Sequence, residues 1–285
     1  MKFKTSLLLL LLILSALTSL PQAKQKQTGT LFIIGGGSRS QELMQSLVNT
    51  AQLNKNDYIV VLPMSGEEPD TSYFYISADL RKVCTNTIAN LNFTKEKIND
   101  KIWLDSVQNA KLIFITGGDQ NRFMEIVLHT PVQEAIQKAY ASGSTIAGTS
   151  AGAAMMSKKM ITGNELSGDS VRSGSFKSIR YNLVEVKEGL GLLSTAVIDQ
   201  HFIARSRYNR LLSVLAANPT YPCIGIDEET AIIVKGKKVT VVGDGQVITL
   251  TLPQPVLRSI KERSLVNLRN IQMNILTKGD VFYLK

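Results

Sequence analysis

Short runs of apolar residues recur along the chain, and each ends in glycine, proline or a small polar residue. The runs in the first half of the chain are Thr30–Ile34, Tyr58–Leu62, Lys111–Ile115 and Ser144–Ala147. Continuous apolar runs are typical of strands buried on both faces of a parallel sheet. Helical patterns lie between them, for example over Gln41–Leu53 and Pro131–Ala141. This alternation predicts an α/β fold with a mostly parallel sheet and helices on both faces.

The last third of the chain has a different pattern. The β-branched segments Ala231–Val234 and Val239–Val242 are separated by the turn-like Lys235–Lys237, and Gly243–Gly245 then leads into Gln246–Leu252. We expect C-terminal β-hairpins added to the sheet. Because no internal repeat or low-complexity linker interrupts the pattern, residues 24–285 are predicted to form a single domain.

Residues 1–23 read as a secretory signal peptide. Lys2 and Lys4 give a positive start, an apolar run spans Leu7–Leu14, and small or polar residues follow up to Ala23. A retained membrane anchor is the rival interpretation, but this run is shorter than the roughly 20 residues that a bilayer requires. We therefore expect a secreted or periplasmic protein that has no stable membrane association after signal removal.

The overall charge changes this picture little. The formal net charge is +9, but the basic residues are scattered and no nucleic-acid motif accompanies them, so nucleic-acid binding is not expected. The only cysteines are Cys84 and Cys223. They allow one disulfide in an oxidising compartment, or two free thiols, and the sequence leaves this open.

The segment Gly148–Gly152 carries the strongest chemical signal. It follows an apolar run, precedes a helix-prone stretch and places Ser150 on the turn between them. A serine at a strand–turn–helix junction flanked by glycines is typical of a nucleophile elbow. Its hydroxyl is a weak nucleophile until a base removes the proton.

Only two histidines could supply that base. His129 ends a helical pattern and is expected to be a surface residue. His201 follows the apolar segment that begins at Val197, and groups at strand ends line ligand sites in open α/β sheets. His201 is therefore the expected base. Its acidic partner is open among Asp227, Glu228 and Glu229, which follow the strand-like Cys223–Ile226.

Backbone amides would stabilise the oxyanion of such a reaction. The N–H of Ala151 follows the candidate nucleophile, and Gly117 and Gly118 end the strand that precedes it in sequence. The similar run Gly35–Gly37 lacks the third glycine of a dinucleotide fingerprint, so NAD is not expected. The histidines and acids show no metal-ligand spacing, and no metal or cofactor is implied.

Arginines recur after His201, at Arg205, Arg207 and Arg210. Guanidinium groups bind carboxylates through paired hydrogen bonds. A substrate carboxylate near the scissile bond is one interpretation, and a solvated helix face is the other.

Together these motifs resemble the cyanophycinases, serine peptidases related to the aspartyl dipeptidase called peptidase E. The resemblance rests on Gly35–Gly37, Thr116–Gln120, Gly148–Ala153, Asp199–Phe202 with the three arginines, and Gly225–Ala231. It covers nearly all of residues 24–285, in order. It implies a fold like that of the class I glutamine amidotransferases, with serine in place of cysteine.

The resemblance also implies an activity. The catalytic triad would be Ser150, His201 and Glu228, and the product would be β-aspartyl-arginine released from cyanophycin, a polyaspartate with arginine on each β-carboxyl. The positions that match the family's binding cleft are Gln120, Asp199, Gln200, Arg205, Arg207 and Arg210. A homodimer is a further implication. The alternatives are a peptidase E-like enzyme for short aspartyl peptides and an inactive relative that binds acidic polymer.

Overall fold

The computed structural model describes residues 29–167, 170–173, 176–252 and 260–284. The predicted signal peptide therefore lies outside the described residues. Within those ranges, no helix is long and apolar enough to cross a membrane.

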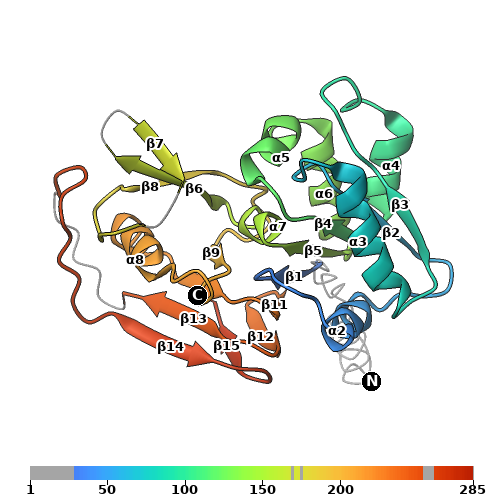
Figure 1. Ribbon diagram of the computed structural model, residues 1–285. Helices are drawn as coiled ribbons and strands as arrows, with labels where there is room; N and C mark the ends of the chain where they lie inside the picture. The colour runs from blue at the N-terminus through green and yellow to red at the C-terminus, as the bar shows by residue number, and fades with distance from the viewer. Residues whose placement is uncertain (1–28, 168–169, 174–175, 253–259, 285) are drawn as a thin grey trace, which may run out of the picture.

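Parallel strands form the larger part of the main sheet, up to one of its edges (Figure 1). In spatial order they are β1 (Thr30–Ile34), β5 (Thr145–Thr149), β4 (Leu112–Ile115), β2 (Tyr58–Leu62) and β3 (Thr87–Asn90). The antiparallel strands β11 (Thr230–Lys235), β12 (Lys238–Gly243) and β15 (Val281–Tyr283) extend the sheet beyond β1. The apolar runs of the first half thus form the predicted parallel sheet.

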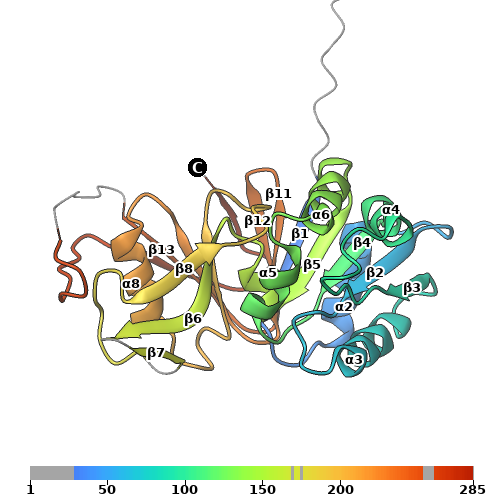
Figure 2. The same ribbon diagram turned by 90° about the horizontal axis from the view of Figure 1, so that it is seen from above.

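Helices cover both faces of this sheet (Figure 2). On one face lie α2 (Gln41–Ala51) and α3 (Pro69–Arg81), and on the other lie α4 (Lys101–Asn109), α5 (Gln120–Val127) and α6 (Pro131–Ala141). The strand β1 shows why the run Leu31–Ile34 is continuously apolar. Phe32 and Ile34 pack in the core of the first face, whereas Leu31 and Ile33 pack in the core of the second.

The caps of the predicted helices follow from their first residues. Ser40 caps α2, because its hydroxyl oxygen accepts a hydrogen bond from the Leu43 N–H at 3.2 Å. α6 begins at Pro131, where the missing N–H costs nothing. The fold class expected from the sequence is confirmed.

A second, four-stranded sheet carries the histidine and the acidic turn. Its order is β14 (Gln272–Leu276), β13 (Val247–Thr251), β10 (Cys223–Ile226) and β9 (Val197–Gln200). The sequence pattern placed the segment after Gly245 on the main sheet. That placement is wrong, because the turn after β12 sends β13 back to pair with β10.

A small third sheet lies beside the second one (Figure 1). It consists of β7 (Ser170–Ser173), β6 (Lys159–Ser167) and β8 (Val184–Glu188). The helix α8 (Tyr208–Ala217) packs between these sheets, with Leu211 and Val214 in a core shared with Ile161 of β6. Neither this sheet nor its position was foreseen from the sequence.

The cysteines are free. Cys223 is buried in the second sheet, where burial raises the pKa of its thiol, and Cys84 is half-buried. His129 is at the surface, with its Nε2 atom 3.5 Å from Glu188, as expected for a helix-end histidine.

Gly225 offers a test of the close packing between β10 and the residue that follows His201. A Cβ atom at this position would lie 2.3 Å from the Phe202 ring, directly after His201. Gly225→Ala should therefore lower the free energy of unfolding by about 1–3 kcal/mol, as overpacking does, and also reduce activity. Urea unfolding and a rate assay would measure both.

Ile224→Val on the same strand is the matched control. It removes one buried methyl group, costs about 0.5–1.5 kcal/mol, and should leave the rate unchanged. Wild-type stability and rate in Gly225→Ala would show that the Phe202 ring is not held by this contact.

Candidate active site

Ser150 stands on a strained turn between β5 and the short helix α7 (Ala151–Ala154). Its φ of 54° and ψ of −113° are rarely adopted by a residue with a side chain. Its N–H donates to the Ile34 oxygen at 3.1 Å. The flanking glycines were expected to adopt the strained backbone conformation of the turn. In the structure Ser150 itself has the positive φ, so the glycines serve another purpose. A Cβ atom at Gly148 would lie 2.5 Å from the Gly152 oxygen, so the glycines permit close approach.

His201 follows β9 and is held against the loop after β1. Its φ is 46°, and its N–H donates to the Gly35 oxygen at 2.8 Å. A Cβ atom at Gly36 would lie 2.3 Å from the Cε1 atom of the imidazole. Gly35–Gly37 therefore forms the seat of the histidine, a role that the sequence did not reveal.

A chain of hydrogen bonds joins the serine, the histidine and one carboxylate. His201 Nε2 lies 2.8 Å from Ser150 Oγ, and His201 Nδ1 lies 2.5 Å from Glu228 Oε1. Because the carboxylate can only accept, Nδ1 carries the proton and Nε2 is free to accept the serine hydroxyl proton. The imidazole is buried, and Glu228 is partly exposed.

The other two acids of the turn have structural contacts. Asp227 Oδ1 accepts the N–H groups of Ile203 and Ala204, at 3.0 and 2.9 Å, and so holds the turn that follows His201. The Glu229 N–H donates to the Gly36 oxygen at 2.9 Å. Of the three acids, the described contacts place Glu228 on the histidine.

The expected oxyanion donors lie around Ser150. Ala151 is the first residue of α7, so its N–H has no acceptor within that helix. A Cβ atom at Gly117 would lie 3.2 Å from Ser150 Cβ. Across the described ranges, no protein acceptor takes the N–H of Gly117 or Gly118. The loop is fixed from behind, since the Ser65 oxygen accepts from the Asp119 N–H and from Arg122.

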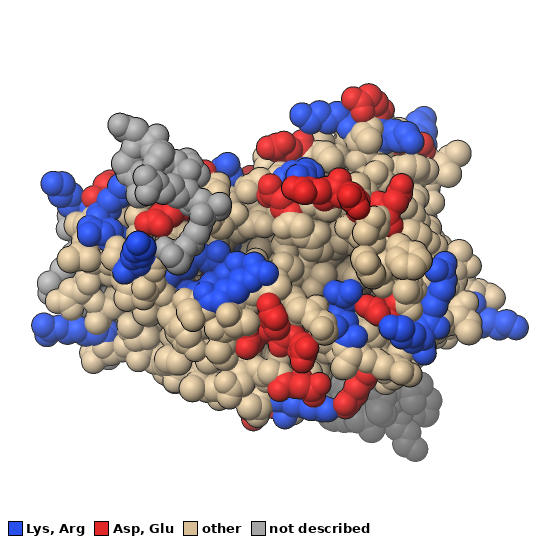
Figure 3. Space-filling view, in the orientation of Figure 1, with Lys and Arg blue, Asp and Glu red and all other residues tan. Residues whose placement is uncertain are grey.

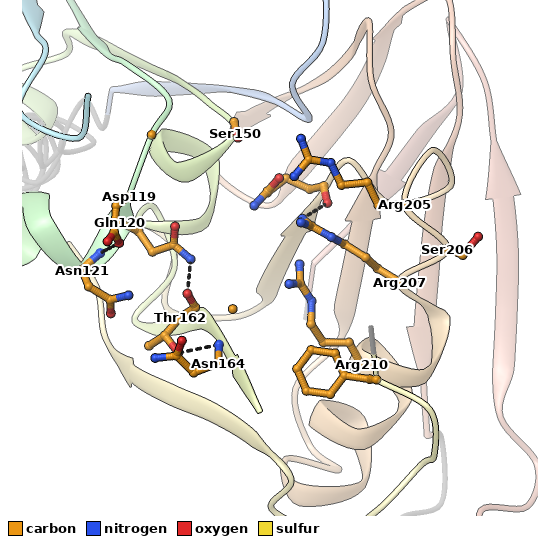
Figure 4. Close-up of a pocket in the computed structure, with 14 residues that line it drawn as sticks. Asp119, Gln120, Asn121, Ser150, Thr162, Asn164, Arg205, Ser206, Arg207 and Arg210 are labelled. Atoms are coloured by element: carbon orange, nitrogen blue, oxygen red, sulfur yellow. Dashed lines mark hydrogen bonds between the residues drawn. The ribbon is translucent and has the colours of Figure 1, made fainter. Parts of the chain in front are cut away.

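A cavity of about 570 Å³ opens beside the serine. Two walls face each other across it (Figure 4). One wall carries Gln120, Thr162 and Asn164, and the other carries the arginines. Basic side chains also gather at the rim of the hollow in Figure 3, and acidic side chains lie on the opposite rim, near α5.

The arginine wall is organised by one buried carboxylate. Asp199 accepts hydrogen bonds from Arg210 through both oxygens, one of them at 2.9 Å, and lies 3.8 Å from Arg207. Arg207 also donates to the Gln200 oxygen at 2.6 Å. Burial first, and then Arg210, lowers the pKa of Arg207 to about 10, so it stays charged at neutral pH.

The arginines do not share one helix face. Arg205 and Arg207 precede α8, and only Arg210 lies within it. Arg205 is exposed at the cavity, whereas Arg210 is buried on Asp199. The interpretation as a solvated helix surface is therefore wrong for Arg210. The three arginines form a wall in which the Arg205 guanidinium has no hydrogen-bond or ion-pair partner among the described residues.

The two glutamines named from the sequence line the same cavity. Gln120 donates its amide N–H groups to the oxygens of Ile161 and Thr162, at 3.1 and 2.6 Å. Gln200 is buried, and its Oε1 atom has no partner among the described groups. Sequence reasoning missed Thr162, Asn164 and Phe176, which also line the cavity. The only signal for them was a glycine within a strand.

The environment of His201 favours the neutral imidazole. Burial lowers the pKa of His201, the hydrogen bond that its Nδ1–H donates to Glu228 raises it, and the positive charge of Arg205 lowers it again. Together these effects lower the pKa of His201 below its ordinary value of 6.5. At neutral pH the ring can therefore accept a proton. Within the described ranges, no group of His, Cys, Asp and Glu side chains could hold a metal ion.

An α/β fold that presents a serine, a histidine and a carboxylate in this way defines a serine-type hydrolase. The chain belongs to peptidase family S51, whose model matches residues 31–242. It is therefore a serine-type peptidase.

Named relatives cover most of the chain. It is 30% identical to the cyanophycinase of Trichormus variabilis, with 93% of this chain and 89% of the relative covered. It is 31% identical to the cyanophycinase of Geminocystis herdmanii, with 90% and 94% covered. The family resemblance seen in the sequence is thereby confirmed.

Solved structures share the fold. A peptidase from an acI-B1 actinobacterium matches with a TM-score of 0.64 at 22% identity, over 91% of this chain and 98% of that one. A putative peptidase E from Listeria monocytogenes matches with a TM-score of 0.52 at 16% identity, over 76% and 100%.

Asp199 provides a stability test. Asp199→Asn leaves the buried Arg210 without its charge partner and should lower the free energy of unfolding by about 3–5 kcal/mol. Glu134→Gln breaks the exposed pair with Lys138 and should cost no more than about 0.5 kcal/mol. If both variants lowered the free energy of unfolding equally in urea, the buried pair would contribute no more to stability than the exposed one.

Arg205 provides a test by pH. The rate at which a fluorophosphonate labels Ser150 should fall as the pH drops through the His201 pKa, because only the neutral imidazole is a base. Arg205→Gln removes a positive charge that lowers this pKa, so the acid limb should move to higher pH. Lys82→Gln on α3 is the control and should leave the limb in place. Added salt should shrink the difference.

Proposed function

We propose that this peptidase is exported and hydrolyses cyanophycin from a chain end, releasing β-aspartyl-arginine dipeptides. The observation that carries the catalytic assignment is the hydrogen-bond chain from Ser150 through His201 to Glu228. The substrate assignment is supported by relatives that are named cyanophycinases.

In the first half of the reaction, Ser150 Oγ attacks the peptide carbonyl carbon while His201 Nε2 takes the hydroxyl proton. The charged oxygen of the tetrahedral intermediate accepts hydrogen bonds from the N–H of Ala151 and from Gly117 or Gly118. The C–N bond then breaks, and His201 gives its proton to the leaving amine. Glu228 stabilises the imidazolium while it exists.

In the second half, water replaces the amine. His201 takes a proton from the water as its oxygen attacks the acyl-serine ester, and the proton returns to Ser150 Oγ as the ester C–O bond breaks. The product leaves as a carboxylic acid. Every step uses side chains and amides of this chain.

The arginine wall suits a substrate that carries carboxylates. The wall combines Arg205, Arg207 and Arg210 with one aspartate, which leaves an excess of positive charge. The guanidinium of Arg205, which has no hydrogen-bond partner within the described ranges, can bind a carboxylate through paired hydrogen bonds, next to the serine. A terminal aspartyl group would be held there during cleavage.

Export and assembly complete the proposal. The apolar start of the chain supports secretion or a periplasmic location, which suits an enzyme that degrades polymer from other cells. The family resemblance supports a homodimer. Light scattering of the protein without residues 1–23 tests the assembly, and a monomer would contradict it.

Ser150→Ala should abolish the release of dipeptides from purified cyanophycin, by about 10⁴-fold or more, while the protein stays folded. Mass analysis of the products measures the release. Ser142→Ala, at an exposed helix end, is the control and should act as wild type.

The products also separate the possible activities. β-Aspartyl-arginine as sole product supports an exopeptidase, and longer fragments contradict one. Rapid cleavage of a soluble α-aspartyl dipeptide without action on cyanophycin would identify an aspartyl dipeptidase instead.

A further inference from the structure

The wall opposite the arginines presents hydrogen-bond acceptors. Gln120 and Asn164 both carry side-chain amides, and the amide nitrogen of each donates to acceptors of the protein, twice in Gln120 and once in Asn164. Gln120 donates to two backbone oxygens, and Asn164 Nδ2 donates to Glu185 Oε2 at 2.9 Å. These partners can only accept, so they fix the orientation of each amide. The side-chain carbonyl oxygens of Gln120 and Asn164 accept no hydrogen bond within the described part of the chain.

A bulge in β6 brings Asn164 to the cavity. Ile161 pairs with Val186 and Glu165 pairs with Val184, so Thr162–Asn164 lie opposite the single residue Glu185. Bulges next to active sites redirect side chains. Gly163, with φ of 94°, lies between the walls, because a Cβ atom there would lie 3.7 Å from Gln120 Nε2 and 4.0 Å from Arg210 Nη1.

Glu185 places a negative charge behind this wall. Its Oε2 accepts from the Thr162 hydroxyl at 2.8 Å as well as from Asn164. Partial burial raises the pKa of Glu185, but the hydrogen bonds from Asn164 and Thr162 and the charge of Lys187 outweigh it, so the pKa lies below its ordinary value. The carboxylate is thus ionised at neutral pH and polarises the Asn164 amide toward the cavity.

We propose that Thr162, Asn164 and Glu185 form a subsite for a guanidinium group of the substrate. A guanidinium has five N–H donors and no acceptor, which matches a wall of acceptor oxygens backed by a carboxylate. The opposite wall consists of guanidinium groups and would repel another one. The cavity therefore sorts a zwitterionic substrate unit, with its carboxylate on the arginines and its guanidinium on Asn164.

This subsite rests on the proposed function for its source of guanidinium, the arginine side chains of cyanophycin. The contacts that build it involve residues outside the proposed catalytic triad. A change at Asn164 or Glu185 should therefore alter the choice among substrates more than the chemistry at Ser150.

The test compares two synthetic dimers of the β-aspartyl-arginine unit. One carries arginine and the other citrulline, in which an oxygen replaces one NH2 group of the guanidinium and the positive charge is lost. Wild type should prefer arginine about 10- to 150-fold in kcat/KM, as expected for lost hydrogen bonds to a charged group. Asn164→Leu removes the acceptor at similar size, and Glu185→Gln removes the charge.

Both variants should reduce the preference to about threefold or less, mainly by raising KM for the arginine substrate. Glu188→Gln changes an exposed acid on β8, the strand that also carries Glu185. It is the matched control and should keep the preference for arginine over citrulline. Thermal unfolding of each variant shows whether it is folded. Equal losses on both substrates in a folded Asn164→Leu, or an unchanged preference, would overturn the subsite.

Binding of agmatine by calorimetry separates this proposal from the proposed function. Agmatine carries a guanidinium and no peptide bond. If wild type binds it and Asn164→Leu binds it at least about tenfold more weakly, the subsite stands even where neither peptide is cleaved. If wild type cleaves the arginine peptide but binding of agmatine is the same in both proteins, the activity stands and the subsite is wrong.

Discussion

The site depends on a seam of backbone hydrogen bonds between two sheets. Ser150 follows β5 of the main sheet, whereas His201 and Glu228 follow β9 and β10 of the second sheet. Gly35–Gly37 joins them, because its oxygens accept from the turns that carry His201 and Glu228. The chain can approach so closely only because these residues lack side chains. The register between the sheets therefore decides whether Ser150 Oγ lies within hydrogen-bond distance of His201 Nε2.

Two carboxylates, Asp199 and Glu185, orient the polar and charged side chains that line the cavity. Asp199 is almost wholly buried, and it fixes Arg210 and positions Arg207, whereas Arg205 is exposed. Glu185 fixes Asn164 and Thr162 on the other side. Each wall is thus oriented by a carboxylate that does not itself face the cavity opening. Such support keeps the walls in one geometry and lowers the entropy lost when a substrate binds.

The sequence predicted the parts of the fold that depend on local pattern. The buried strands of the main sheet and the helix Pro131–Ala141 follow from period and composition, and so does the junction at Ser150. The role of Gly35–Gly37 could not be predicted, since it follows from contact with residues far along the chain. The choice among Asp227, Glu228 and Glu229 rested on family resemblance, because adjacent acids on a turn have the same local pattern. Asn164 was missed because a bulge leaves no periodic signal.

The backbone at Ser150 and His201 has a consequence for how this protein could change. Both residues occupy conformations with positive φ, which glycine adopts without strain. At these two positions the chemistry demands one residue and the backbone would favour another. Stability and turnover therefore compete within the same two side chains. Under the proposed mechanism, glycine at either position would relieve backbone strain only by removing a group that the reaction requires.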